Sequence, residues 1–304
     1  MKVAIIGSGA VGLLLASYLC KVNICPVIYT RREEQAISLN KNGLEMVRHG
    51  ETEVFEVTAF PFSNGLQNDE DVIFITVKQY DLASIIEYLI ENKIKTPIVF
   101  LQNGMGHIAF LSNLYSDSIY LGIVEHGVIK YSDTCISHTG EGQIKIAKYY
   151  GRMDEIMGLG QALSSIGFTI KLEEDWYETL VRKLIVNAVI NPLTALYRVR
   201  NGSLLENQYY CKSMRAVFME VVAALNLTGI ESLWNEVISI CKNTGNNYSS
   251  MYKDIENRRQ TEVHSILGYL IEEGGNRNKP TPLLEFLYNS IKGMENIGKE
   301  EGNG

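Results

Sequence analysis

The chain has 304 residues, of which 46% are hydrophobic and 21% charged, so it has the composition of an ordinary globular protein and the length for two domains. Its net charge of −7 argues against a nucleic-acid-binding surface, which needs a basic face. Apart from residues 3–19 there is no apolar run of about 20 residues, so we expect no membrane span. The five cysteines form no C-x-x-C pair and the five histidines no H-E-x-x-H pair. We therefore expect no disulfide framework, no metal and a reducing, cytoplasmic location.

A glycine-rich turn lies near the start of the chain. Val3–Ile6 has the pattern of a buried strand, and residues 11–19 have that of an apolar helix. The glycines of the G-x-G-x-x-G pattern between them are Gly7, Gly9 and Gly12. In a dinucleotide-binding turn these three permit the tight turn, the approach of a pyrophosphate and helix–strand packing, and the helix N–H groups attract the phosphates. The predicted cofactor loop comprises Gly7, Gly9, Ala10, Val11 and Gly12.

The same residues allow one alternative, a signal peptide ending at a lipid-attachment cysteine, Cys20. A second apolar strand, Val27–Thr30, favours the nucleotide-binding interpretation instead. Arg31 and Arg32 end this strand, about 20 residues after the glycines, where an NADP enzyme places an arginine for the 2′-phosphate. Arg31 therefore favours NADPH; the alternative is a pair of solvated charges in a turn.

Strand and helix patterns alternate up to residue 172. We expect a hairpin at 44–60, helices at 81–91 and from 107, and strands at 71–77, 96–101, 120–130 and 134–148. This order predicts an α/β domain with a parallel sheet, of the Rossmann-like class. Ligands of such sheets bind beyond the carboxyl ends of the strands, and Lys78 and Asn103 occupy such positions.

After residue 172 the pattern is helical. We expect helices near 176–197, 203–227, 231–243, 249–273 and 281–296. The chain is therefore predicted to have a dinucleotide-binding domain at 1–172 and an all-helical substrate domain at 173–304, with the substrate in a cleft between them.

Three polar residues interrupt the most apolar of these helices. Lys183, Asn187 and Asn191 recur every four residues, so a helix places them on one stripe. Because buried polar groups need partners, we predict that this stripe faces a ligand. The alternative is a surface lysine with helix-capping asparagines.

A later segment adds a carboxylate. In a helix over 249–273, Glu262 would share a face with Met251 and Ile266, and a carboxylate on an apolar face usually binds something. An internal ion pair with Arg258 or Arg259 is the alternative. The preceding 246–250 stretch suits a loop and a helix N-terminus that can receive an anion.

Together these segments resemble the ketopantoate reductases (2-dehydropantoate 2-reductases) over nearly the whole chain. The matching motifs are the glycine turn, Lys78 after an apolar strand, Asn103-Gly-Met-Gly, Arg-Lys183-Leu-x-Val-Asn187-x-x-Ile-Asn191-Pro-Leu-Thr-Ala, Asn201-Gly, Ser249-Ser250-Met-x-x-Asp-Ile and Thr261-Glu262. One departure is the turn at 22–26, where the family usually carries a glycine.

The resemblance implies an oxidoreductase that uses NADPH to reduce ketopantoate to pantoate, on the route to pantothenate and coenzyme A. It implies that Lys183 is the general acid and that Glu262 holds the terminal hydroxyl of the substrate. The implied substrate-binding residues are Lys183, Asn187, Asn191, Asn201, Ser250 and Glu262, and the implied cofactor-binding residues beside the glycine loop are Arg31, Lys78 and Asn103.

Two alternatives remain open at this point. One is a related NADP-dependent dehydrogenase acting on another 2-keto or hydroxy acid, and the other is an NADPH-binding sensor without catalysis. Apolar faces of the late helices allow a homodimer, although core packing explains them equally well.

Overall fold

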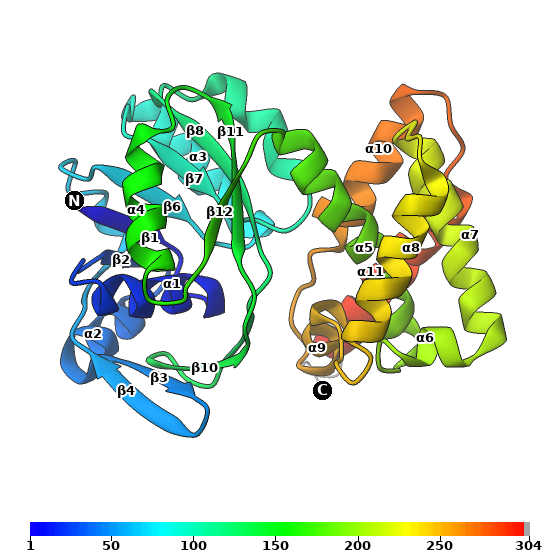
Figure 1. Cartoon of the computed structure of the whole chain (residues 1–304), viewed down its shortest axis with the longest axis horizontal. Coiled ribbons are helices and arrows are strands. Elements are labelled where there is room, and N and C mark those ends of the chain that lie inside the picture. Colours follow the sequence, from blue (N-terminus) through cyan, green and yellow to red (C-terminus); the bar gives the residue numbers. More distant parts are fainter. Residues whose placement is uncertain (301–304) are drawn as a thin grey trace. The chain divides into compact units, whose positions relative to one another are not determined.

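The computed structural model describes residues 1–300, with the side chains of residues 155 and 296–300 left undescribed. The last four residues of the predicted second domain, 301–304, lie outside the described residues. The chain forms two compact units, one of residues 1–102 and 109–180 and one of residues 103–108 and 181 onward (Figure 1). The domain boundary placed after residue 172 stays a prediction.

The first unit is built on an eight-stranded sheet in the order β12-β11-β8-β7-β6-β1-β2-β5. Its strands are β1 (Val3–Ile6), β2 (Val27–Thr30), β5 (Thr58–Pro61), β6 (Val72–Ile75), β7 (Ile98–Phe100), β8 (Ile119–Val124), β11 (Ile144–Tyr150) and β12 (Ile170–Glu173). The six strands from β8 to β5 are parallel, whereas β11 runs antiparallel to β8. Fully buried strands such as β1 explain the continuous apolar runs in the sequence. The predicted α/β, Rossmann-like class is confirmed.

Four α-helices connect these strands: α1 (Ala10–Lys21), α2 (Glu33–Asn42), α3 (Leu82–Glu91) and α4 (Asp154–Ser164). The helix expected from residue 107 is a 3-10 helix, Gly106–Asn113. Every residue of α1 from Gly12 to Leu19 is buried, so this helix is the centre of the apolar core. The turn after α1 has no glycine, and Asn23 adopts the left-handed conformation there (φ 59°), which asparagine tolerates better than most residues.

A second sheet of four strands, in the order β4-β3-β10-β9, packs against α1. The hairpin expected at 44–60 is confirmed in its turn and shorter in its extent: it comprises β3 (Leu44–Arg48) and β4 (Glu51–Phe55), joined by His49 and Gly50, both with positive φ, whereas residues 58–61 form β5 of the main sheet. The single strands expected at 120–130 and 134–148 are wrong. Each is two strands, because β9 (Gly127–Lys130) and β10 (Cys135–Gly140) lie in the second sheet, where β10 pairs with β3 of the hairpin and β9 pairs with β10.

The second unit is helical. Its helices are α5 (Trp176–Tyr197, whose first turn belongs to the first unit), α6 (Ser203–Glu206), α7 (Gln208–Ala224), α8 (Ile230–Asn243), α9 (Ser250–Glu256), α10 (Tyr269–Asn276) and α11 (Pro282–Glu300). Two expected helices are interrupted. Asn207 ends the first and caps α7, its side chain accepting the Tyr209 N–H at 2.9 Å. The helix expected at 249–273 stops at Glu256, and Arg258 turns the chain with a left-handed φ of 52°.

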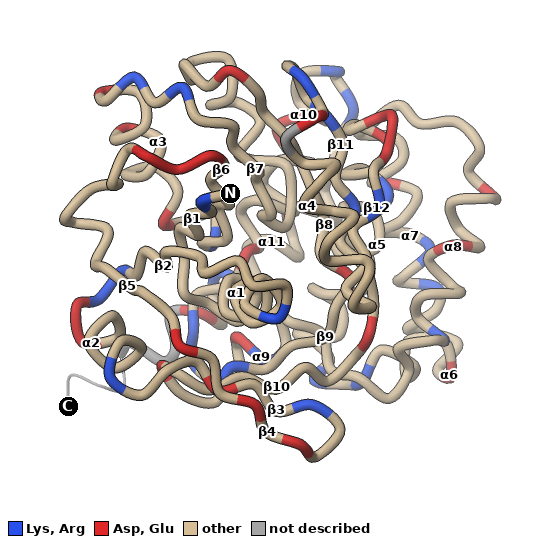
Figure 2. Tube along the Cα trace, turned by 60° about the vertical axis from the view of Figure 1, so that its left-hand side comes forward, with Lys and Arg blue, Asp and Glu red and all other residues tan. Residues whose placement is uncertain are grey.

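Among the described residues, α5 alone meets the length and hydropathy of a membrane-crossing helix, and 78% of that window is buried inside the structure. Such burial is that of a core helix in a globular unit. Lys and Arg are interspersed with Asp and Glu along the trace (Figure 2).

Two histidines are packed where the two sheets of the first unit meet. His126 stacks on Phe168, and its Nδ1 accepts the Gly142 N–H at 3.2 Å. His138 Nδ1 lies 2.8 Å from the Tyr18 hydroxyl, and its Nε2 lies 3.1 Å from His126 Nδ1. Burial, and then the proximity of His138, lowers the pKa of His126 to about 4; burial also lowers the pKa of His138. Both rings are therefore neutral at pH 7.

This pair predicts a loss of stability in acid. The unfolded chain binds a proton at His126 below about pH 6.5, whereas the folded chain binds it only below about pH 4. Stability is therefore complete above pH 6.5 and falls by up to about 1.4 kcal/mol per pH unit below it for this histidine. Urea unfolding of wild type and His126→Phe at pH 8, 6 and 5 measures the slope. We expect a shallower fall in the variant, and equal slopes would contradict the assignment.

Candidate active site

The glycine loop has the shape of a phosphate cradle. A Cβ on Gly7 would lie 2.7 Å from the Val77 nitrogen, and one on Gly12 would lie 1.9 Å from the Gly7 carbonyl oxygen. A Cβ on Gly9 would meet nothing within 4 Å, so the backbone there is open. Two glycines are thus required by close packing, and the third leaves room beside the N-terminus of α1. The residues present fit a dinucleotide pyrophosphate at this place.

Side chains that sequence reasoning missed brace this loop from behind. The Ser8 carbonyl accepts hydrogen bonds from Lys130 Nζ at 2.9 Å and from Gln35 Nε2 at 3.0 Å. Ser8 Oγ in turn donates to Gln35 Oε1 at 2.8 Å. Burial is the largest influence on Lys130 and lowers its pKa, although Asp133 at 3.6 Å opposes this. No local pattern in the sequence marked Lys130, because its strand β9 belongs to the second sheet.

Arg31 and Lys78 lie beyond the carboxyl ends of β2 and β6, the two strands that flank β1. Arg31 is 75% exposed at the end of β2, and its guanidinium donates to Asp81 Oδ1 at 2.9 Å. Lys78 follows β6, one residue beyond Val77, which touches Gly7, and its ammonium lies 6.0 Å from the Tyr80 ring centre. β1 and β6 pair in parallel with Ile6 opposite Ile75, so the glycine loop and Lys78 leave the sheet at the same edge.

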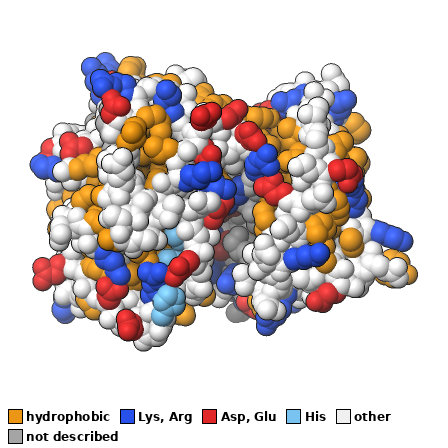
Figure 3. All heavy atoms as spheres, viewed as in Figure 1, with side chains coloured by type: hydrophobic (Ala, Val, Ile, Leu, Met, Phe, Trp, Pro, Cys, Tyr) orange, Lys and Arg blue, Asp and Glu red, His pale blue; other side chains and the backbone are white. Residues whose placement is uncertain are grey.

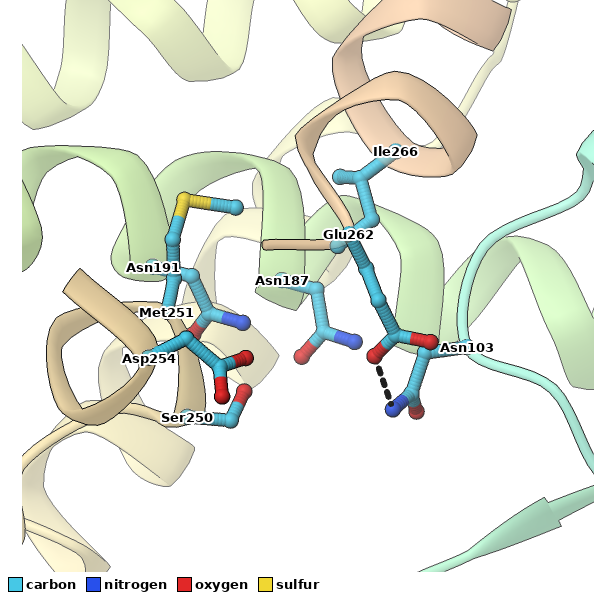
Figure 4. A pocket seen from close by; sticks show the side chains of 8 residues that line it. All are labelled: Asn103, Asn187, Asn191, Ser250, Met251, Asp254, Glu262 and Ile266. Carbon is cyan, nitrogen blue, oxygen red and sulfur yellow. Dashed lines mark hydrogen bonds between the residues drawn. The ribbon is translucent and has the colours of Figure 1, made fainter. Parts of the chain in front are cut away.

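The second unit contains a small polar pocket of about 220 Å³, including its open side. Its lining residues are Asn103, Asn187, Asn191, Ser250, Met251, Asp254, Glu262 and Ile266. Figure 4 shows the polar ends from α5, α9 and the two loops carrying Asn103 and Glu262 converging on one space. Amides, a hydroxyl and carboxylates in one pocket can bind a small molecule that carries both hydroxyl and carboxylate groups.

The α5 stripe supplies one wall of this pocket. Asn187 is half-buried and Asn191 is 8% exposed, and both line the space. Lys183, also half-buried, lies one turn earlier on the same helical face. The wall is tied to the opposite one, because the hydroxyls of Thr194 on α5 and Ser249, the N-cap of α9, are 2.8 Å apart.

Glu262 reaches the pocket by a route different from the expected one. It does not share a helical face with Met251, because α9 has ended at Glu256. Its carboxylate instead accepts a hydrogen bond from Asn103 Nδ2 at 2.9 Å. Arg259, considered as its ion-pair partner, lies 3.5 Å from Asp254 Oδ1. Asp254 was missed as a lining residue, although its place one helical turn after Ser250 is a usable signal.

A π-helical turn, His264–Gly268, fixes the Asn103 loop beside Glu262. The Ser265 carbonyl accepts the Met105 N–H at 3.1 Å. Gly104, between Asn103 and Met105, has a φ of +78°, and a Cβ on it would lie 2.2 Å from the Ser265 carbonyl oxygen. Turns of this kind occur frequently at functional sites. Here the turn presents a carbonyl to a neighbouring loop and so places Asn103 on Glu262.

Asn201 lies outside the lining of this pocket. It is 7% exposed, and its Nδ2 donates to Thr244 Oγ1 at 2.9 Å. The Asn201 N–H donates to the Asn247 carbonyl at 3.0 Å, so the residue ties two loops together. Its role in substrate binding stays a prediction.

Comparisons with known proteins identify the family to which this chain belongs. The family model described as Ketopantoate reductase PanE/ApbA matches residues 3–151, and its C-terminal partner matches residues 175–295. The chain belongs to the ketopantoate reductase family. Within this family it is 42% identical to the 2-dehydropantoate 2-reductase of Bacillus subtilis, over 97% of this chain and 98% of that protein. It is 37% identical to that of Listeria innocua, over 97% of each.

Solved structures agree with the family assignment. The crystal structure of a probable 2-dehydropantoate 2-reductase from Bacillus subtilis has a TM-score of 0.87 and 42% identity, covering 97% of this chain and all of that one. A D-mandelate dehydrogenase bound to NADH and anilino(oxo)acetate also has a TM-score of 0.87, covering 98% of this chain and 99% of that one. Its identity is 22%, so this likeness concerns the fold alone.

The docking of the Asn103 loop predicts a strong effect of one methyl group. Gly104→Ala places a Cβ in the Ser265 carbonyl and strains a left-handed backbone, so we expect a loss of about 2–4 kcal/mol of unfolding free energy. Gly275→Ala in α10 is the control, because a Cβ there meets nothing within 4 Å. Urea unfolding at pH 7 compares the two variants with wild type. Equal midpoints for Gly104→Ala and wild type would show that the loop does not dock as described.

Proposed function

We propose that this chain is an NADPH-dependent 2-dehydropantoate 2-reductase that converts ketopantoate to (R)-pantoate, in the biosynthesis of pantothenate and coenzyme A. The relatives with this name cover the chain from end to end, at 42% and 37% identity. The structural observation that carries the proposal is the pocket itself. It gathers two asparagines of the Lys183 helix, Ser250 and Glu262 within one unit.

In this proposal the first unit holds the cofactor. N–H groups at the start of α1 bind the pyrophosphate at the open backbone of Gly9, and Arg31 binds the 2′-phosphate. Lys78, at the same sheet edge, adds a further positive charge. When bound, NADPH supplies the hydride that the ketone carbon accepts.

Lys183 is the proposed general acid. As the ketone is reduced, negative charge grows on its oxygen, and an ammonium within hydrogen-bond reach stabilises that charge and then donates the proton that completes the alcohol. Such positioned acid catalysis contributes roughly 10²–10⁴-fold. Asn187 and Asn191, on the same face of α5, orient the polar groups of the substrate without adding charge.

Glu262 and Ser250 are the proposed specificity groups. The Glu262 carboxylate accepts the terminal hydroxyl of ketopantoate, while Asn103 fixes the orientation of that carboxylate through the 2.9 Å hydrogen bond. Ser250, exposed at the first position of α9, donates to the substrate carboxylate. A site built to bind a hydroxyl strongly disfavours an analogue that lacks one.

NADPH oxidation in the presence of ketopantoate, followed spectrophotometrically, tests the whole proposal. We expect Lys183→Met to lower kcat at least about 100-fold while the Kd for NADPH stays within twofold. Lys212→Met, an exposed lysine of α7, is the control and should retain wild-type kcat. Unchanged turnover in Lys183→Met would reject the acid role. Faster turnover of another 2-keto acid by the wild type would favour the alternative dehydrogenase, and binding without turnover would favour the sensor.

Cofactor preference has its own test. Arg31→Ala should raise the Kd for NADPH about tenfold or more and leave that for NADH within twofold, because only NADPH carries the 2′-phosphate. Arg152→Ala removes an equally exposed arginine of the first unit and should change neither value. Fluorescence titration with both nucleotides gives these constants. A parallel loss of both affinities would exclude 2′-phosphate recognition by Arg31.

A homodimer in the cytoplasm completes the proposal. Apolar side chains are visible on the surface of the helical unit (Figure 3). Tyr209 of α7 and Phe286 of α11 are among the exposed large apolar side chains. All five cysteines are free thiols, as suits a reducing compartment. Sedimentation equilibrium measures the assembly.

A further inference from the structure

A buried carboxylate on α11 bonds to a residue outside that helix as well as to one within it. The Glu295 side chain is 6% exposed. Its Oε1 accepts two hydrogen bonds from Thr261, one from the N–H at 2.8 Å and one from the hydroxyl at 2.6 Å. Its Oε2 lies 2.5 Å from Lys292 Nζ. A carboxylate removed from water needs such partners, so Glu295 fixes the place of Thr261 relative to α11.

Thr261 precedes Glu262 at the end of the loop between α9 and the π-helical turn. The Thr261 hydroxyl also accepts the Val263 N–H at 3.2 Å, and Ser265 Oγ donates to the Glu262 carbonyl at 3.0 Å. The backbone is therefore tied down on both sides of Glu262. Of these ties, the two from Glu295 alone reach a different helix, 34 residues further along the chain.

We propose that Glu295 is a positioning residue for Glu262, holding Thr261 so that the Glu262 carboxylate meets Asn103 in the pocket. This inference rests on the proposed function, in which Glu262 binds the substrate hydroxyl. Glu295 itself does not line the pocket. Without Glu295, the 257–262 loop keeps its length but loses the contact that fixes its end, and the Glu262 carboxylate samples other directions.

Steady-state kinetics with ketopantoate and NADPH test the inference. Glu295→Ala should raise the KM for ketopantoate about tenfold, the loss expected for one misplaced charged hydrogen bond, while the Kd for NADPH stays within twofold. Glu295→Gln keeps an oxygen for both Thr261 donors and should restore the KM to within about threefold of wild type. Glu285→Ala is the matched control, because Glu285 also lies on α11 and accepts a threonine hydroxyl, that of Thr281 at 3.2 Å, away from Glu262.

A double-mutant cycle separates positioning from general support of the fold. If Glu295 acts through Glu262, adding Glu295→Ala to Glu262→Ala should raise the KM for ketopantoate no further. A full additional tenfold rise, or a single variant whose thermal midpoint falls with an unchanged KM, would overturn the proposal. Should Glu295→Ala fail to fold, Thr261→Val removes the hydroxyl contacts to Glu295 and to the Val263 N–H but keeps the Thr261 N–H bond to Glu295, and should raise the KM about threefold; an unchanged KM would again overturn the proposal.

One readout does not depend on the substrate. In protein labelled with ¹³C at glutamate carboxyls, the Glu262 resonance is the one lost in Glu262→Gln. It should shift in Glu295→Ala and stay in place in Glu285→Ala, even if ketopantoate is not reduced. A shift without ketopantoate turnover in wild type would reject the proposed function and keep the positioning role, whereas an unmoved resonance would reject the positioning role.

Discussion

The hydrogen bond between Asn103 and Glu262 is the contact on which the pocket depends. It joins residues 159 positions apart, from a loop that follows β7 and from a loop that follows α9. A half-buried carboxylate needs a donor, and an amide whose own backbone is docked on the Ser265 carbonyl supplies one in a fixed direction. Because residues 103–108 belong to the same compact unit as Glu262, this geometry is internal to one unit.

The sequence predicted the elements whose signals are local. The glycine turn and the bounds of α5 followed from spacing and periodicity, since the same residues that make the pattern also make the packing. The second sheet could not be predicted in the same way. Residues 120–130 and 134–148 each have the pattern of a continuous strand, and the points at which they leave the main sheet are set by the pairing of β10 with β3 of the hairpin and of β9 with β10.

The site residues divide in the same way, into those with a local signal in the sequence and those without one. Asn187 and Asn191, which line the pocket, were recognisable because polar residues on an apolar helix need polar partners. Lys183 lies on the same face outside the lining, and its role stays a prediction. The prediction that Glu262 shares a helical face with Met251 was wrong. The helix ends at Glu256, and Arg258 after it has a left-handed backbone, so helical periodicity does not extend to Glu262. Lys130, Gln35 and Glu295 had no local signal at all. Each acts on a residue that is distant in sequence, and only the assembled fold brings the two together.

The break before Glu262 has a mechanical consequence. On a continuous helix, the direction of Glu262 would be tied to that of Met251 and Asp254 by the 3.6-residue period, so any repacking of α9 would turn all three together. A loop followed by a π-helical turn separates the two directions. The separation costs about 1–2 kcal/mol of backbone entropy for each loop residue that is ordered, and the bonds to Glu295, Ser265 and Asn103 offset that cost.

A D-mandelate dehydrogenase shares the fold at 22% identity, so the overall architecture does not select the substrate. In the proposed function, the groups that select it are those whose direction is set independently of the helices, and Glu262 with its neighbour Thr261 is held by three separate segments.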